Sequence, residues 1–162
     1  MSNAIKLTTM IPIGNIALSR DVIISDPCYD PDTWCTIRTR LPKAKYSCNI
    51  YLENQRNAAL VILKNGITED NVDYKYIGSA GVDSGQLGIF DLDYFKTHQP
   101  DDDYENPDSW YSKVCHATIE PGYVITDGKG VCSSTYCGDG MYPVYEILHN
   151  GKVVGLRANF IE

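Results

Sequence analysis

Apolar residues along the chain occur in short runs or alternate with polar residues, and turn-forming residues separate these segments. Alternation with a period of two is typical of β-strands, whereas an amphipathic helix repeats its apolar residues every three or four positions. The pattern therefore predicts strands over residues 5–10, 16–25, 46–53, 58–64, 74–77, 123–126, 131–134, 142–148 and 153–160.

Turn signals between these segments indicate that neighbouring strands are antiparallel. The Asn-Gly pair at 150–151 is the strongest hairpin signal, and the loop at 54–57 joins another two strands. Proline and glycine at 12–14 predict a break between the first two strands. The Asp-Pro-Cys-Tyr sequence at 26–29 predicts a turn, and residues 30–34 predict a short helical turn after it.

Helix signals are sparse. Residues 91–97 predict one short helix after a strand, and Asn106-Pro107-Asp108 predicts the start of a helix over 109–116. The predicted fold class is mainly β (α+β): an antiparallel sheet, a sandwich or a partly open barrel, with one or two short helices.

Composition narrows the class of protein. A chain of 162 residues fits a single globular domain, and residues 1–4 resemble the remnant of an expression tag. The net charge of -7 argues against general nucleic-acid binding, and no apolar run is long enough to cross a membrane. We therefore expect a cytoplasmic protein; its oligomeric state stays open.

The six cysteines have spacings that do not fit a zinc site. With no secretion signal in view, we expect reduced and mostly buried thiols. These cysteines are Cys28, Cys35, Cys48, Cys115, Cys132 and Cys137.

Two glycine-rich stretches, 81–91 and 132–145, combine carboxylates and hydroxyls with short apolar runs. Runs of this kind cannot satisfy buried carboxylates alone, so we expect residues 82–85 and 135–140 to meet, with Asp26 close by. Their glycines would then floor a concave site. The candidate ligand-binding residues are Asp26, Asp83, Ser84, Ser133, Ser134, Thr135, Tyr136, Asp139 and Tyr142.

Two alternatives apply to the aspartates. Asp83, Asp91 and Asp139 would hold a hard cation that activates water in a metal-dependent phosphodiesterase or hydrolase. Each aspartate would otherwise cap backbone amides in a turn, which the turn-rich composition favours. A catalytic triad is not expected, because the histidines lie outside both stretches. We expect no cofactor and no bound metal.

A shift of 65 residues places Ser19 on Ser84, Asp26 on Asp91 and Tyr29 on Tyr94. Both segments contain a hydroxyl, a strand and an Asp-x-x-Tyr exit. So few matches can arise by chance, and a shared way of ending a strand is preferred over a true repeat.

Three motifs resemble those of a family of small phage and bacterial proteins of unknown function. They are Val-Asp-Ser-Gly-Gln-Leu at 82–87, Asp-Pro-Cys-Tyr at 26–29 and Gly-Asp-Gly-Met-Tyr-Pro-Val-Tyr at 138–145. In that family the first motif runs straight into the second, whereas here they are separated. Tyr136-Cys137 also replaces the usual Gly-Tyr. The resemblance implies an intracellular, phage-associated β-rich domain, and it brings no activity with it.

We therefore expect a small binding protein of phage type, which holds a small polar or nucleotide-like ligand, or a host protein. Its specific form would be a counter-defence protein that sequesters a nucleotide-like signal in the host cytoplasm. The alternatives are the metal-dependent phosphodiesterase and a structural or assembly protein without a ligand.

Overall fold

The computed structural model describes residues 9–98, 103, 105–120 and 122–161. It contains two antiparallel sheets and two helices, with 55% of residues in strands and 11% in helices. The mainly β prediction is confirmed. The first four residues of the predicted strand at 5–10, and the tag-like residues 1–4, lie outside the described residues. In the described part of the chain, no helix is long and apolar enough to cross a membrane.

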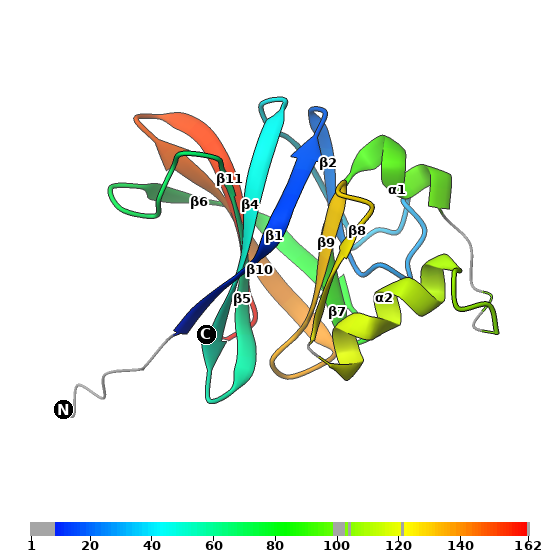
Figure 1. Cartoon of the computed structure of the whole chain (residues 1–162). Coiled ribbons are helices and arrows are strands. Elements are labelled where there is room, and N and C mark those ends of the chain that lie inside the picture. Colours follow the sequence, from blue (N-terminus) through cyan, green and yellow to red (C-terminus); the bar gives the residue numbers. More distant parts are fainter. Residues whose placement is uncertain (1–8, 99–102, 104, 121, 162) are drawn as a thin grey trace.

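The molecule has three layers: a six-stranded sheet, a five-stranded sheet and a pair of helices (Figure 1). The six-stranded sheet has the order β1 (Thr9–Leu18), β4 (Ala44–Glu53), β5 (Arg56–Lys64), β11 (Lys152–Asn159), β10 (Gly140–His149) and β6 (Asp73–Val82). The five-stranded sheet has the order β3 (Ile37–Arg40), β2 (Asp21–Ser25), β7 (Gln86–Asp91), β9 (Gly130–Ser134) and β8 (Tyr123–Thr126). Helices α1 (Leu92–His98) and α2 (Trp110–Ile119) cover the other face of the second sheet.

Two buried clusters hold these layers together. The larger one lies between the sheets and includes Leu18, Ile24, Leu60 and Leu156. The smaller one lies under the helices, where the Phe90 ring stacks near Phe95 and Trp110 at centroid distances of 5.0 Å and 5.4 Å. Burial of such side chains stabilises each layer by about 1.5–3 kcal/mol per residue.

Three local predictions need correction. Residues 12–14 do not end a strand, because β1 continues through them with a bulge. The break falls instead at Ser19-Arg20, between β1 and β2. Residues 30–34 form successive hydrogen-bonded turns rather than a helical turn. Both predicted helices are present, and Ser109 caps α2 by accepting a bond from the Ser112 backbone N–H.

The strand order reveals an internal two-fold repeat. In the six-stranded sheet, β1, β4 and β5 on one side correspond to β6, β10 and β11 on the other. In the five-stranded sheet, β2 pairs with β7, and each has its own outer neighbour, β3 or β9. At the centre of each sheet, equivalent residues of the two copies face each other. Ile24 pairs with Ile89 in the five-stranded sheet, and Val61 pairs with Arg157 in the six-stranded sheet. The chain is thus a tandem of β1–β5 and β6, β7, β9, β10 and β11.

Details of register support this repeat. The bulge of β1 skips Ile13 before Gly14, and the bulge of β6 skips Ile77 before Gly78. Both glycines have a positive φ, 147° and 143°, which a residue with a side chain rarely adopts.

A tyrosine pair repeats in the same way. The hydroxyl of Tyr46 donates to the Pro42 carbonyl, and that of Tyr142 donates to the Gly138 carbonyl, both at 2.6 Å. The 65-residue echo is therefore part of a true structural repeat, and the preference for a shared way of ending a strand alone is wrong. Helices α1 and α2 and strand β8 are inserted in the second copy alone.

Candidate functional site

The two glycine-rich stretches meet at one end of the β2–β7 pair, as predicted. Thr135 N–H donates to the Gly85 carbonyl at 3.0 Å, and Gly85 N–H donates to Asp139 Oδ1 at 3.1 Å. Strand β10 also begins opposite the end of β6, with Gly140 beside Val82. We call this end the closed pole; it comprises Asp26, residues 83–85 and residues 135–139.

Asp26 is the anchor of the closed pole. Its carboxylate accepts from the backbone N–H groups of Cys28, Asp83 and Ser84 and from the Ser84 hydroxyl, at 2.8–2.9 Å. The residue is 0% exposed. Four donors saturate a buried carboxylate, so Asp26 joins two loops and has no capacity for a ligand.

The hydroxyls of the second stretch also bond within the protein. Asn57 Nδ2 donates to Ser133 Oγ and Ser134 Oγ at 3.1 Å. Thr135 Oγ1 donates to the Gly138 carbonyl, which Tyr142 also uses. The Arg56 guanidinium lies 5.3 Å from the centre of the Tyr136 ring. These hydroxyls therefore bond within the framework, although Ser134, Thr135 and Tyr136 also line a pocket of about 330 Å³.

Three glycines of the sheets do not floor a cavity, whereas Gly140 lines a groove of about 670 Å³. A Cβ at Gly81 would lie 2.7 Å from Cys35 Sγ, and a Cβ at Gly88 would lie 2.3 Å from the Phe90 ring. Gly130 faces the same ring at 2.3 Å. These positions are small because neighbouring side chains occupy the space, which corrects the expectation of a glycine-floored concavity.

Asp83 and Asp139 are the exposed carboxylates of the closed pole, and Asp83 has the shifted pKa. Desolvation and the negative charges of Asp26 and Asp139 raise its pKa above the ordinary value. A hydrogen bond with Tyr29 acts in the opposite direction. Because like charges surround Asp83, its ionised form weakens this end of the molecule.

Asp91 lies at the other end of β7, which contradicts the three-aspartate hypothesis. The strand places Gln86 at the closed pole and Asp91 about 16 Å away, at roughly 3.3 Å per residue. Asp91 therefore cannot share one cation with Asp83 and Asp139. Among the described residues, no group of three carboxylate, histidine or cysteine side chains has metal-binding geometry.

Asp91 repeats the role of Asp26 in the other copy of the fold. It accepts bonds from the backbone N–H of Ser19, at 2.8 Å, and from the Ser19 hydroxyl. It also accepts from Tyr94 N–H at 3.3 Å, which caps α1. The pairs Ser84–Asp26 and Ser19–Asp91 are therefore equivalent by the internal two-fold.

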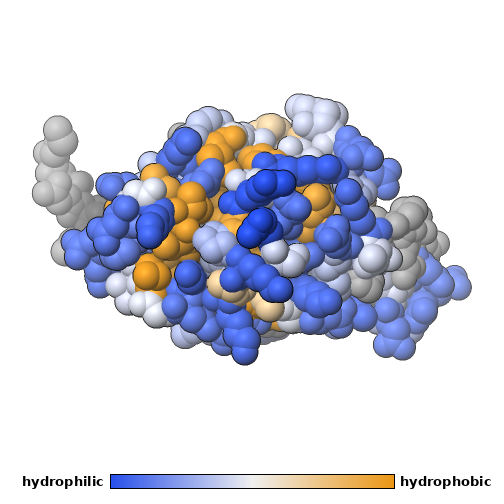
Figure 2. Space-filling view, turned by 90° about the horizontal axis from the view of Figure 1, so that it is seen from above, coloured by the Kyte–Doolittle hydropathy of each residue, from blue (hydrophilic) through white to orange (hydrophobic). Residues whose placement is uncertain are grey.

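A cavity of about 750 Å³ lies at this second end. We call it the open pole. It lies at the top of Figure 1, between the β1–β2 turn and α1, and Figure 2 looks onto this end, where hydrophobic residues are visible between hydrophilic ones. Its lining consists of Ala17, Leu18, Ser19, Lys43, Asp91, Asp93, Tyr94, Thr97, Asp127 and Lys129.

One residue distinguishes the two poles. Asp139 immediately precedes β10 and closes its pole by accepting from Gly85. The residue that precedes β4 is Lys43, and an ammonium group has no lone pair to accept such a bond. The cationic side chain instead lines the cavity.

The cavity presents both cationic and anionic groups. Lys43 and Lys129 come from two different turns, and no ion pair among the described residues includes either of them. Asp93 is exposed, whereas Asp127 accepts from the Tyr94 hydroxyl at 2.6 Å. Burial and the contact with Asp127 raise the pKa of Tyr94, so its hydroxyl stays protonated at neutral pH.

Apart from Asp91, sequence reasoning missed the residues that line this cavity. The repeat contained the available signal, because it aligned Ser19 and Asp91 with two residues already chosen as candidates. The lysines carry no such signal, since isolated lysines are common on protein surfaces.

The six cysteines are free thiols. Cys35, Cys48 and Cys132 are buried, and burial raises the pKa of Cys48 to about 12. Cys28 is exposed, yet desolvation and the charge of Asp26 raise its pKa to about 11. A thiol protonated at neutral pH is a poor nucleophile.

Comparison with protein-family models, with curated proteins and with solved structures gave no match, so the argument for function depends on the geometry of the two poles.

Proposed function

We propose that this protein binds a small phosphorylated molecule that also carries hydroxyl or amine donors, such as a nucleotide, in the cavity at the open pole. The observation that carries the proposal is the convergence of Lys43 and Lys129 on a cavity whose two-fold counterpart is closed by Asp139. Neither lysine forms an ion pair with another described residue.

The charges of the cavity support this ligand class. Two ammonium groups suit a phosphate, because lysine acts as a compact positive charge that donates hydrogen bonds to phosphate oxygens. Asp93 is free to accept from ribose hydroxyls or an exocyclic amine, because it is exposed at the rim. A purely anionic ligand would meet three carboxylates, so a ligand with donors at one end fits better.

The size of the cavity agrees with such a ligand. Sites for small molecules commonly measure about 300–1,000 Å³ and combine apolar walls with a few polar groups. Here the volume is about 750 Å³, and Leu18 and Ala17 supply the apolar part of the wall. Sequestration of a nucleotide-like signal, as in a counter-defence protein, is the specific form of this proposal.

A thermal-shift series tests the proposal. Adenosine 5′-monophosphate and ribose 5-phosphate should raise the melting temperature, since a ligand at 100 times its Kd stabilises by about 2.7 kcal/mol. Lys43→Ala and Lys129→Ala should each weaken binding at least tenfold. Lys45→Ala, which removes an exposed lysine of β4 outside the cavity lining, is the matched control and should change nothing.

Two binding results, and the absence of any binding, would contradict the proposal. One is stabilisation by Mg²⁺ or Mn²⁺ alone, which would favour the metal-dependent hydrolase. The other is binding that survives both lysine substitutions, which would place the ligand elsewhere. Absence of stabilisation by any phosphorylated compound would favour an assembly protein without a ligand.

A further inference from the structure

A second departure from the two-fold repeat lies at the edge of the six-stranded sheet. Seven large hydrophobic residues of the described chain are exposed, and four of them gather around β6. Tyr74 and Tyr76 lie on β6, at 45% and 57% exposure, and Met141 lies on β10 at 52%. Trp34, 85% exposed, precedes Cys35, whose carbonyl accepts from Gly81 N–H of β6 at 3.0 Å. We call these four residues the aromatic corner.

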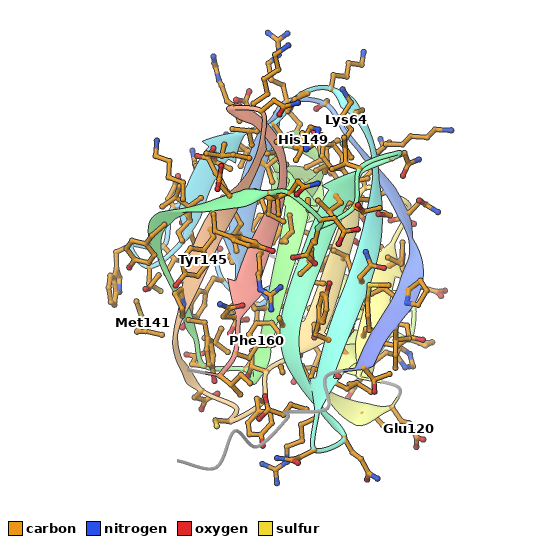
Figure 3. All side chains as sticks on the ribbon, turned by 90° about the vertical axis from the view of Figure 1, so that its left-hand side faces the viewer. Lys64, Glu120, Met141, Tyr145, His149 and Phe160 are labelled. Carbon is orange, nitrogen blue, oxygen red and sulfur yellow. The ribbon has the colours of Figure 1, made fainter. Side chains whose placement is uncertain are left out.

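The corner borders a groove on the outer face of the sheet. Strand pairing places Met141 beside Gly81, Pro143 beside Ser79 and Tyr145 beside Tyr76. The rings of Tyr76 and Tyr145 meet edge to face, with centroids 5.8 Å apart. Figure 3 shows Met141 and Tyr145 near this edge of the sheet. The groove has a volume of about 670 Å³, and small residues such as Ser79 and Gly140 lie between its bulkier walls.

The equivalent corner in the other copy is less apolar, although Met10, 49% exposed, stands there in the place of Tyr74. When the two copies are aligned on their bulges, Tyr76 is equivalent to Pro12 and Ser79 is equivalent to Asn15. On the neighbouring strand, Met141 corresponds to Lys45. Proline and lysine are residues with which proteins commonly protect an edge strand from pairing. The large exposed side chains at 76 and 141 are therefore specific to the β6 copy, whereas the exposed apolar residue at 74 has a counterpart in Met10.

Strand β6 also offers its backbone. It lies at the edge of its sheet and pairs with β10 alone. On its other side, the bond from Gly81 N–H to the Cys35 carbonyl is the one backbone hydrogen bond to another described residue. The segment from Tyr74 to Ser79 therefore presents N–H and C=O groups on which another strand can pair.

The charge around β6 selects the partner. Asp139 lines the groove, and Asp73 and Asp83 stand at the two ends of the strand. The lysine of β6, Lys75, lies opposite Glu146. With a net charge of -7 on the whole chain, a second copy would meet like charges here, whereas a basic segment would meet opposite ones.

We propose that the aromatic corner docks an extended segment of a partner protein that alternates apolar and basic residues and pairs as an additional strand beside β6. Main-chain bonds to residues 74–79 would align the segment, and its apolar side chains would contact Tyr76 and Met141. Exposed Trp, Tyr and Met are the residue types that interfaces favour. This surface is separate from the open pole and does not depend on the nucleotide proposal.

The test uses a capped octapeptide of alternating valine and lysine, added to the full chain labelled with ¹⁵N. We expect amide shifts concentrated in residues 74–79, and at least tenfold weaker binding of the matching valine–glutamate peptide. Tyr76→Ser should reduce affinity at least fivefold. Met10→Ser, which removes an exposed apolar residue from the opposite edge strand, should leave it unchanged.

Three outcomes would overturn the proposal. These are shifts outside β6, equal binding of the basic and acidic peptides, and no binding of the basic peptide at millimolar concentration. Self-association through β6 in sedimentation velocity, abolished by Tyr76→Ser, would also overturn it, because the occupant would then be a second copy.

Discussion

The two copies of the repeat share their framework and differ where their surfaces face solvent. Both contain the same bulge, with Gly14 in one and Gly78 in the other, and both tie a tyrosine hydroxyl to a carbonyl four residues earlier. The residue before β4 is Lys43, whereas the residue before β10 is Asp139. Positions that keep the repeat are therefore explained by folding, and positions that break it are where we place ligand and partner binding.

The largest expected effect separates the two anchoring aspartates. Asp26→Ala leaves four donors without their acceptor in a fully buried site, whereas Asp91→Ala leaves three at a residue that is 6% exposed. Stranding a buried partner costs about 1–3 kcal/mol, and more for charged groups. We expect a loss of about 4 kcal/mol for Asp26→Ala and about 2 kcal/mol for Asp91→Ala in urea unfolding. Equal losses, or the reverse order, would show that the poles are not closed and open as described.

A smaller effect tests the repeat itself. Tyr46→Phe and Tyr142→Phe each remove one hydrogen bond to a backbone carbonyl in equivalent positions. Each should lower the free energy of unfolding by about 1 kcal/mol, the usual net value of such a bond. If the losses for the two variants differed by more than about 1 kcal/mol, the two tyrosine hydrogen bonds would not contribute equally to stability, and the repeat would not extend to this contact.

The smallest expected effect concerns Asp83. Its pKa is raised in the folded protein, so the native state binds a proton more readily than the unfolded state, and stability falls as pH rises through the raised pKa. Asp83→Asn removes this loss and should raise the melting temperature slightly at pH 7. The difference should vanish at pH 3, below the ordinary carboxyl pKa of 3.8, where both side chains are neutral. A variant less stable than the parent at pH 7 would contradict the charge crowding at the closed pole.

The sequence contained most of the fold but little of the site. Alternation and the Asn-Gly turn at 150–151 predicted the hairpins, because register follows local pattern and turn chemistry. Pro12 was misread as a break because a proline can occupy an edge strand at a bulge, and only the pairing with β4 reveals that β1 lies at an edge.

The site was mostly missed for a related reason. Composition predicted that the two glycine-rich stretches meet. It cannot distinguish a carboxylate whose acceptor positions are all occupied, such as that of Asp26, from one that is available to a ligand. Lys43 and Lys129 are far apart in the sequence and converge only through tertiary structure.

The central claim is that the open pole, and not the closed one, is the ligand site. Titration of the ¹⁵N-labelled chain with adenosine 5′-monophosphate tests it most directly. We predict the largest amide shifts at Ser19, Lys43, Thr97 and Lys129, and no significant shifts for residues 83–85 and 137–139. Shifts centred on the closed pole, or none at either pole with any phosphorylated compound of the series, would contradict the account.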